Sequence, residues 1–247
     1  MRLTVLGSNG TYPTPGHPAS GYAVSTPTTT VLLDLGPGVF VASVAAGLVP
    51  DAVVLTHVHP DHCSDVFALL AALRFGDPAR WGLPVMVPAG LVARVAAFLG
   101  AGETHDLHRV LEFDEVTPGD LRVVGDLSVR FGAAIHPVPA LIVSIDDGRR
   151  RLVYSGDTGP GGDLAALAKG CDLLLCEATL QGALGKDRYP YHLSALEAGA
   201  IGRAAGVGRL LVTHLSPTLD AAVSMSEAGH EFDGSLDLAV PGMEVEL

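Results

Sequence analysis

Three histidines and an aspartate stand close together in the segment His57-Val-His59-Pro-Asp61-His62. The segment follows a short apolar run, residues 52–55, that is typical of a buried strand. Extended backbone here would place His57 and His59 on the same side, because strand side chains alternate with period two. Imidazole and carboxylate groups suit zinc, iron or manganese as ligands. A solvated polar turn does not explain this density, so we interpret the segment as a metal site.

The same pattern, a ligand-type residue after a strand-like run, returns later in the chain. The residues are His136, Asp157, His192 and His214. Each one alone would more often be structural, but their coincidence with the first cluster needs an explanation. A centre of two metal ions, which lie ~3.5–4 Å apart in proteins, needs several neutral nitrogens and a bridging carboxylate. The set therefore predicts a two-metal centre.

The other histidines do not belong to a comparable pattern of ligand-type residues. His105 and His108 lie in an expected loop without a third ligand, and His230 follows the last expected helix. His17 lies in an irregular loop, where it could also overhang a pocket. We interpret all four as surface histidines.

The composition favours a globular protein with a large core. Of 247 residues, 48% are hydrophobic and the mean hydropathy is +0.38, which excludes a disordered chain. No apolar run approaches the ~20 residues of a membrane helix, and the N-terminus is too strand-like for a signal peptide. The three cysteines form an odd set without zinc-knuckle spacing, which indicates reduced thiols. We therefore expect a cytoplasmic protein without a membrane partner.

The net charge of −12 argues against a nucleic-acid partner. Proteins that grip a phosphate backbone carry basic patches. The densest basic run here, Arg149-Arg150-Arg151, lies in an expected hairpin turn and is better explained as a solvated turn. A small-molecule substrate is favoured over RNA.

The order of the expected elements indicates an α/β protein built in layers. Strands come first as meanders and then alternate with helices, twice over, which two sheets packed face to face with helices outside would explain. We find no linker and predict one domain, residues 1–247. Strands are expected at residues 3–6, 22–25, 30–35, 52–55, 85–87, 110–113, 121–124, 127–131, 141–145, 151–154, 173–176, 210–212 and 238–240, and helices at 39–48, 66–73, 91–99, 164–168, 194–205 and 221–228.

Taken in order, these motifs resemble those of the metallo-β-lactamase superfamily. The matching residues are His57-Val-His59-Pro-Asp61-His62, His136, Ser155-Gly156-Asp157-Thr158 and Thr213-His214. The resemblance extends from the first strand to the last. It implies an αββα sandwich, in which two mixed sheets lie face to face with helices outside and a dinuclear metal site lies at one edge.

The resemblance also implies a role for each ligand. His57, His59 and His136 would hold one ion, and Asp157 would bridge to the other. The second ion would be held by Asp61, His62 and His214. Zinc is the first expectation for both ions, with manganese and iron as alternatives.

Within the superfamily, the chain resembles the ribonuclease Z-like branch. The residues that carry this are Cys176-Glu177-Ala178-Thr179 and His192-Leu-Ser194-Ala195. By this resemblance, a metal-bridging hydroxide attacks phosphorus, with Asp61 handling its proton. His192 contacts the substrate phosphate and protonates the leaving oxygen, Glu177 orients His192, and Ser194 also contacts substrate. Ser194 is in addition expected to cap a helix, with Glu197 at the capping-box spacing.

Two departures from that branch matter. Cys176 stands where the branch has histidine, which we expect to remove one polar group near the site. Members that process tRNA 3′ ends carry a long arm that clamps tRNA, whereas residues 137–156 here predict only a hairpin.

The favoured function is therefore a metal-dependent phosphodiesterase for a small substrate, a cyclic nucleotide first. One alternative is ribonuclease Z-type tRNA 3′ processing without the arm, and another is ester hydrolysis as in glyoxalase II or lactonase relatives. A non-catalytic metal-binding protein is the remaining class. Relatives of this type are often dimers, so a homodimer is one option, but the sequence shows no readable interface and does not identify the oligomeric state.

Overall fold

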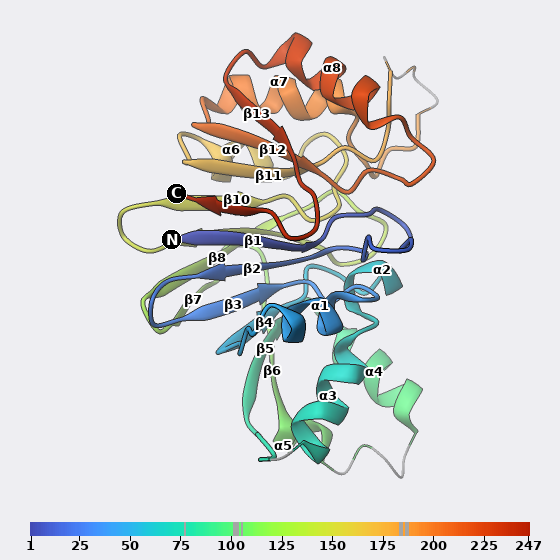
Figure 1. Ribbon diagram of the computed structural model, residues 1–247, viewed down its shortest axis with the longest axis vertical. Helices are drawn as coiled ribbons and strands as arrows, with labels where there is room; N and C mark the ends of the chain where they lie inside the picture. The colour runs from blue at the N-terminus through green and yellow to red at the C-terminus, as the bar shows by residue number, and fades with distance from the viewer. Residues whose placement is uncertain (77, 101–103, 105, 183–184, 186–187) are drawn as a thin grey trace.

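The computed structural model describes residues 1–247 except 77, 101–103, 105, 183–184 and 186–187. Within the described residues, two sheets of seven strands each lie face to face and helices cover their outer faces (Figure 1). This is the metallo-β-lactamase sandwich, and it confirms the predicted fold class. The prediction succeeded because a run of strands followed by alternating strands and helices restricts the ways in which sheets and helices can form layers.

The first sheet runs in the order β14-β1-β2-β3-β4-β5-β6. Strands β3 to β6 are parallel to one another, so their carboxyl ends meet at one edge of the sheet. The strands are β1 (Arg2–Gly7), β2 (Gly21–Ser25), β3 (Thr30–Leu33), β4 (Ala52–Val54), β5 (Leu83–Val87), β6 (Leu111–Glu115) and β14 (Glu244–Glu246).

The second sheet runs in the order β13-β12-β11-β10-β9-β8-β7. Its strands β10 to β13 are parallel, and β9 is antiparallel to both β8 and β10, so β8 points the same way as β10. The strands are β7 (Leu121–Val124), β8 (Leu127–Ala133), β9 (Leu141–Asp146), β10 (Arg151–Tyr154), β11 (Leu173–Glu177), β12 (Arg209–Thr213) and β13 (Ser235–Leu238).

The helices divide between the two outer faces. Helices α1 (Val39–Ala45), α2 (Pro60–Cys63), α3 (Val66–Phe75), α4 (Leu91–Leu99) and α5 (Leu107–Val110) follow strands of the first sheet. Helices α6 (Leu164–Ala168), α7 (Ala195–Ala205) and α8 (Ala221–Glu231) follow strands of the second. Separate apolar clusters lie between the sheets and under each helical layer. None of the described helices is long and apolar enough to cross a membrane.

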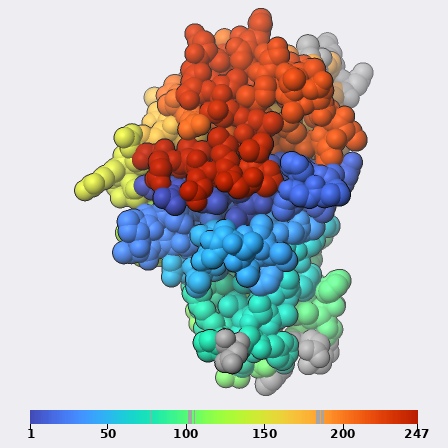
Figure 2. Space-filling model, in the orientation of Figure 1, coloured from blue at the N-terminus to red at the C-terminus, as the bar shows by residue number. Residues whose placement is uncertain are grey.

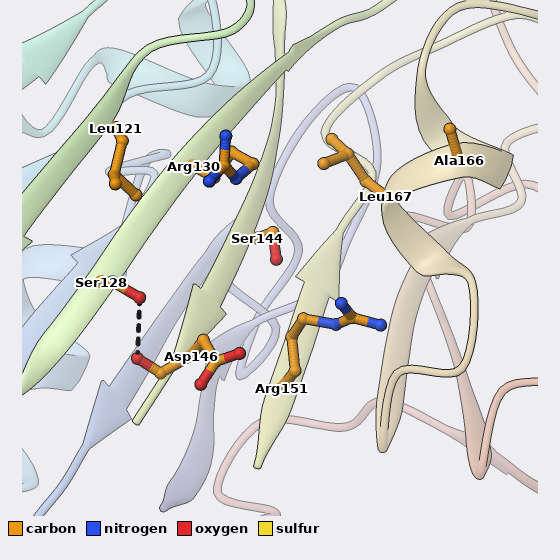
Figure 3. A pocket seen from close by; sticks show the side chains of 8 residues that line it. All are labelled: Leu121, Ser128, Arg130, Ser144, Asp146, Arg151, Ala166 and Leu167. Atoms are coloured by element: carbon orange, nitrogen blue, oxygen red, sulfur yellow. Dashed lines mark hydrogen bonds between the residues drawn. The ribbon is translucent and has the colours of Figure 1, made fainter. Parts of the chain in front are cut away.

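Alternation along the strands decides which side chains enter the core. In β8, Leu127, Val129 and Phe131 are buried, while Ser128 and Arg130 face outward. α6 packs against part of this outward face, beside β8, β9 and β10. The part of the face that α6 leaves open carries polar side chains. Ser128 and Arg130 line a pocket of about 310 Å³ that also includes Ala166 and Leu167 of α6. Figure 3 shows the side chains that line it.

The C-terminal region departs from the sequence prediction. The expected terminal strand at residues 238–240 is wrong: β13 ends at Leu238, and the last strand is β14. β14 pairs antiparallel with β1, although the two strands stand at opposite ends of the sequence. The C-terminal segment therefore lies against the N-terminal one (Figure 2). Its three residues are too few to show a strand period in the sequence. The short helix α5 was likewise expected as loop.

Candidate metal centre

All seven residues predicted as ligands lie at one edge of the sandwich. The first group follows β4, and His136, Asp157 and His214 follow β8, β10 and β12. Because these strands end at the same edge, side chains far apart in sequence meet there.

The ligand atoms form two groups that share one aspartate. His57, His59, His136 and Asp157 place one ligand atom each within 4.8 Å of one another. Asp61, His62, His214 and the same Asp157 form the second group on the same criterion. The division matches the one implied by the resemblance.

The two carboxylate oxygens of Asp157 face different groups. Oδ2 lies 3.7 Å from Nε2 of His57, while Oδ1 lies 3.2 Å from Nε2 of His62 and 3.3 Å from Nε2 of His214. Asp157 is buried, with 3% of its surface exposed. This is the position that a carboxylate between two cations would take.

The arrangement of these atoms fits metal ions. Nε2 of His136 lies 3.0 Å from Nδ1 of His59, and the Nε2 atoms of His62 and His214 lie 3.1 Å apart. Two nitrogens on one tetrahedral zinc, each ~2.0–2.1 Å from it, would be separated by ~3.3–3.4 Å. Nε2 of His57 and Oδ1 of Asp157 are buried without a hydrogen-bond partner. Buried polar atoms are rarely left so, and a cation would satisfy them.

Hydrogen bonds fix the free nitrogens of His62 and His136. Nδ1 of His62 lies 2.7 Å from a carboxylate oxygen of Asp34, and Nδ1 of His136 lies 3.3 Å from the carbonyl oxygen of Tyr191. Both partners only accept hydrogen bonds, so each Nδ1 carries the proton. In the neutral ring, Nε2 is then unprotonated and available to a metal, as ligating histidines generally require.

Asp34 is a site residue that the sequence analysis missed. It is fully buried, and its carboxylate accepts hydrogen bonds from the backbone and side chain of Thr56, from the hydroxyl of Tyr154 and from His62. Because the Thr56 hydroxyl donates to Asp34, it accepts the Nδ1 proton of His57 at 3.1 Å. Asp34 therefore orients His62 directly and His57 through Thr56. In the sequence, Asp34 is a charged residue within the apolar run 30–35, and the sequence analysis assigns that whole run to a strand.

Glu177 acts in the same way on two other histidines. Its carboxylate lies 3.1 Å from Nδ1 of His192 and accepts a 2.6 Å hydrogen bond from the hydroxyl of Thr179. That hydroxyl in turn accepts the Nδ1 proton of His214 at 2.8 Å. The fully buried Glu177 thus orients His192 directly and His214 through a threonine.

Removing the Thr179 hydroxyl should therefore weaken metal binding. In Thr179→Val the ring of His214 loses its acceptor, and we expect metal affinity to fall by about 10- to 100-fold, as for other partners of ligating histidines. Titration of the metal-free protein with zinc measures this affinity. Thr179→Ser keeps the hydroxyl and should retain the affinity, and Thr218→Val alters an exposed threonine as the matched control. Equal affinities for the valine variant and the wild type would refute the role of Thr179.

The charge state of the cluster suits a cation. Burial lowers the pKa of His57 and His59, and lowers that of His136 to about 4, so these imidazoles are neutral at neutral pH. Burial opposes ionisation of Asp157, but the charges of His214 and His62 hold its pKa well below the usual range. His62 is the exception, because Asp157 and Asp34 raise its pKa in spite of burial. The surrounding carboxylates thus favour a positive charge within the cluster.

Three residues at the centre hold unusual backbone angles. Within the described chain, the non-glycine residues with positive φ are Thr11 (64°), Asp34 (61°) and His214 (58°). The backbone N–H of Thr11 donates to Asp61 at 2.9 Å, so all three bear on the ligands. Such conformations cost free energy and persist where the surrounding structure imposes them, often at functional sites.

His192 lies against this centre without belonging to either group that shares Asp157. Its Nδ1 is 3.9 Å from Asp157, and its ring centroid is 5.5 Å from that of His136. The ring stacks on Tyr189 with centroids 5.7 Å apart and planes inclined by 25°. Burial lowers its pKa, but the hydrogen bond and charge of Glu177 outweigh this, so the pKa of His192 is raised.

The segment that carries His192 is held by the start of α7. Arg188 donates to the carbonyl oxygen of His192 and pairs with Glu197. Ser194 caps α7: its hydroxyl accepts from the backbone of Glu197, and the Glu197 side chain accepts from the backbone of Ser194, which is the expected capping box. Ser194 is 1% exposed, and its contact with substrate stays a prediction.

Ser194→Ala should destabilise the protein by about 1 kcal/mol, because an N-cap acceptor of α7 is lost. Chemical denaturation measures the free energy of unfolding. Ser194→Asn retains a capping side chain and should lose only a few tenths of that amount. A loss of turnover that Ser194→Ala and Ser194→Asn share, without any loss of stability in Ser194→Asn, would instead assign the hydroxyl to the substrate.

The structure also bears on two further expectations, which concern Cys176 and residues 137–156. Cys176 lies in the apolar cluster between the second sheet and its helices, so the expected loss of a polar group at the site is wrong. Residues 137–156 form the predicted hairpin of β9 and β10. Of the other histidines, His17, His108 and His230 belong to no metal-binding group of the described residues, and His105 lies outside those residues.

Comparison with known proteins agrees with this geometry. A model of the "Beta-lactamase superfamily domain" matches residues 29–215. The chain is 35% identical to the uncharacterized protein ML1173 of Mycobacterium leprae, over 100% of this chain and 89% of that protein. It is 30% identical to the ribonuclease Z of Myxococcus xanthus, over 100% of this chain and 98% of that protein.

One relative is matched both in sequence and in structure. The chain is 30% identical to the probable metallo-hydrolase YhfI of Bacillus subtilis, over 98% of both chains. The crystal structure of YhfI, described as a metallo-beta-lactamase fold protein, superposes with a TM-score of 0.86 over 99% of each chain at 27% identity.

Proposed function

The chain belongs to the beta-lactamase superfamily and is a metallo-hydrolase, and we propose that it uses two divalent metal ions to hydrolyse a small phosphodiester, a cyclic nucleotide foremost. The observation that carries the proposal is the pair of His192 and Glu177 beside the ligand cluster. Hydrolysis of a phosphodiester expels an alkoxide, a poor leaving group, which needs a proton in the transition state. A histidine fixed by a carboxylate next to a metal centre supplies it.

Each side chain has a part in this reaction. His57, His59 and His136 would hold one ion and Asp61, His62 and His214 the other, with Asp157 between them. Zinc is the first candidate for both ions, with manganese and iron as alternatives. When bound, such ions neutralise charge on the phosphoryl oxygens and lower the pKa of water.

Proton transfer is assigned to two residues. Asp61 has one carboxylate oxygen fixed by the backbone of Thr11, and its pKa is held low by its histidine neighbours, although burial raises it. It can orient the attacking water and hold its proton. His192 holds a proton on Nδ1 toward Glu177 and donates the one on Nε2 to the leaving oxygen.

A substrate panel tests the proposal. Protein loaded with zinc or manganese is incubated with 3′,5′-cyclic AMP, a precursor tRNA and S-lactoylglutathione. We expect 5′-AMP to form at a rate far above that of His192→Ala. Absence of 5′-AMP above that variant would reject the cyclic nucleotide, and turnover of the thioester alone, unaffected in His192→Ala, would point to an ester hydrolase.

Processing of tRNA 3′ ends is the second candidate, because a relative of 30% identity over the whole chain is named ribonuclease Z. Against it stand the net charge of −12 and the plain hairpin where the clamping arm is expected. Cleavage of the precursor at the discriminator base would favour this candidate, together with an affinity that falls steeply with salt.

A further inference from the structure

A pocket of about 450 Å³ opens directly beside the metal centre. One wall comes from the first sheet, where Pro88 and Ala89 follow β5 and residues 116–118 follow β6. The other wall is the segment 133–141, between β8 and β9 of the second sheet. The pocket therefore lies at the same edge of the sandwich as the ligands. We call it the proline pocket, after the four prolines that line it: Pro88, Pro118, Pro137 and Pro139.

His136 connects the pocket to the metal centre. His136 lines the pocket, and its Nε2 lies 3.0 Å from Nδ1 of His59 within the ligand cluster. The carbonyl oxygen of Tyr191 fixes the ring through Nδ1. A substrate with its phosphoryl group at the centre can therefore extend one end past His136 into the proline pocket.

The lining determines the chemistry of that end. Apart from His136, no side chain that lines the proline pocket is ionisable; alanine, valine, leucine and proline make up the wall, with Thr117 as the remaining polar side chain. The Thr117 hydroxyl already donates to Asp120 at 3.1 Å. Anions and ammonium groups would find no charged side chain of opposite sign to pair with here, and burying an unpaired charge costs much more free energy than burying an uncharged ring.

The shape of the pocket restricts the occupant further. Proline has a fixed φ, so the His136-Pro137-Val138-Pro139 segment is a rigid, preformed wall. Pockets of ~300–1,000 Å³ with apolar walls accept small molecules. A flat, uncharged ring system satisfies the volume and the lining together.

We propose that the proline pocket binds the uncharged aromatic end of the substrate, the nucleobase in a nucleotide phosphodiester. This inference rests on the proposed function for the identity of the group that joins this end to the metal centre. Val138, on the wall and outside the catalytic groups, then determines specificity.

The test compares two phosphodiesters with the same leaving group. Thymidine 5′-p-nitrophenyl phosphate carries a base, and methyl p-nitrophenyl phosphate does not. In Val138→Asp, a carboxylate enters the apolar wall, and we expect kcat/KM for the thymidine ester to fall by roughly tenfold or more, the size of a lost base contact. The methyl ester should be hydrolysed at the wild-type rate. Val223→Asp places the same charge on an exposed valine of α8 and should change neither rate.

Two additions make every outcome decisive. Ala89→Trp fills the proline pocket from the opposite wall without adding charge and should produce the same selective loss. Calorimetry with 5′-AMP measures binding without turnover, and Val138→Asp should weaken it by roughly tenfold. Equal effects on both esters, or unchanged 5′-AMP affinity, would overturn the pocket assignment. If the wild type hydrolyses neither ester but Val138→Asp still loses 5′-AMP affinity, the phosphodiesterase proposal fails and the pocket stands.

Discussion

We expect His192→Ala to lower the turnover of 3′,5′-cyclic AMP by about 10²- to 10⁴-fold, the contribution of a positioned general acid, and to leave the metal content unchanged. We expect unchanged content because His192 lies outside both groups that share Asp157; its ligand atoms form a further group with Glu177 and His214, so the metal content of the variant is measured as well. The loss arises in the chemical step, where the leaving alkoxide no longer receives the proton that Glu177 helps to hold on the ring.

The leaving group separates this role from simple binding. A p-nitrophenolate departs without a proton, so hydrolysis of bis-p-nitrophenyl phosphate should be affected far less by His192→Ala than hydrolysis of the cyclic nucleotide. His230→Ala, an exposed histidine outside the centre, is the matched control and should alter neither reaction. Equal losses on both substrates would assign His192 to binding or structure rather than to proton donation.

Metal removal should abolish activity and also lower stability. The candidate ligands are buried or partly buried and converge on Asp157. Ions that bind only the folded chain therefore stabilise it by an amount that grows with the logarithm of the free metal concentration. With free metal at about 1,000 times its dissociation constant the gain is ~4 kcal/mol. For a domain of this size, this corresponds to roughly 8–16 °C in Tm.

Thermal unfolding with a chelator and then with added zinc measures the shift, and a titration measures how many ions bind. We expect two ions per chain in the wild type and one in His59→Ala or His62→Ala, each of which removes a ligand from one group only. A wild-type stoichiometry of one, or a Tm that is indifferent to the chelator, would contradict the two-ion centre.

The convergence of the seven candidate metal ligands could be predicted from sequence, because their residue types are rare together and each follows a strand. His136, Asp157 and His214 are far from His57 in sequence, yet parallel strands bring their ends to one edge. The fold followed from the same reasoning, since the order of strands and helices constrains how layers can form.

The residues that orient those ligands could not be predicted in this way. Thr56 and Thr179 act through one hydroxyl, and Tyr191 through a backbone carbonyl oxygen that any residue possesses. Thr11 likewise contributes only a backbone N–H to Asp61. Nothing in the type of these residues distinguishes them from ordinary loop and strand positions, so only their positions in the fold identify them.

Relieving the left-handed backbone conformation of Thr11 should have opposite effects on thermal stability and on catalysis. Glycine adopts this conformation without strain, so Thr11→Gly would recover part of the roughly 1–3 kcal/mol that a non-glycine residue spends there. The same change gives residue 11 a wider range of conformations, and its N–H would then hold Asp61 less firmly. A laboratory selection for thermostability alone would accept this substitution, whereas a selection for turnover would reject it, which is the conflict expected where function depends on strain.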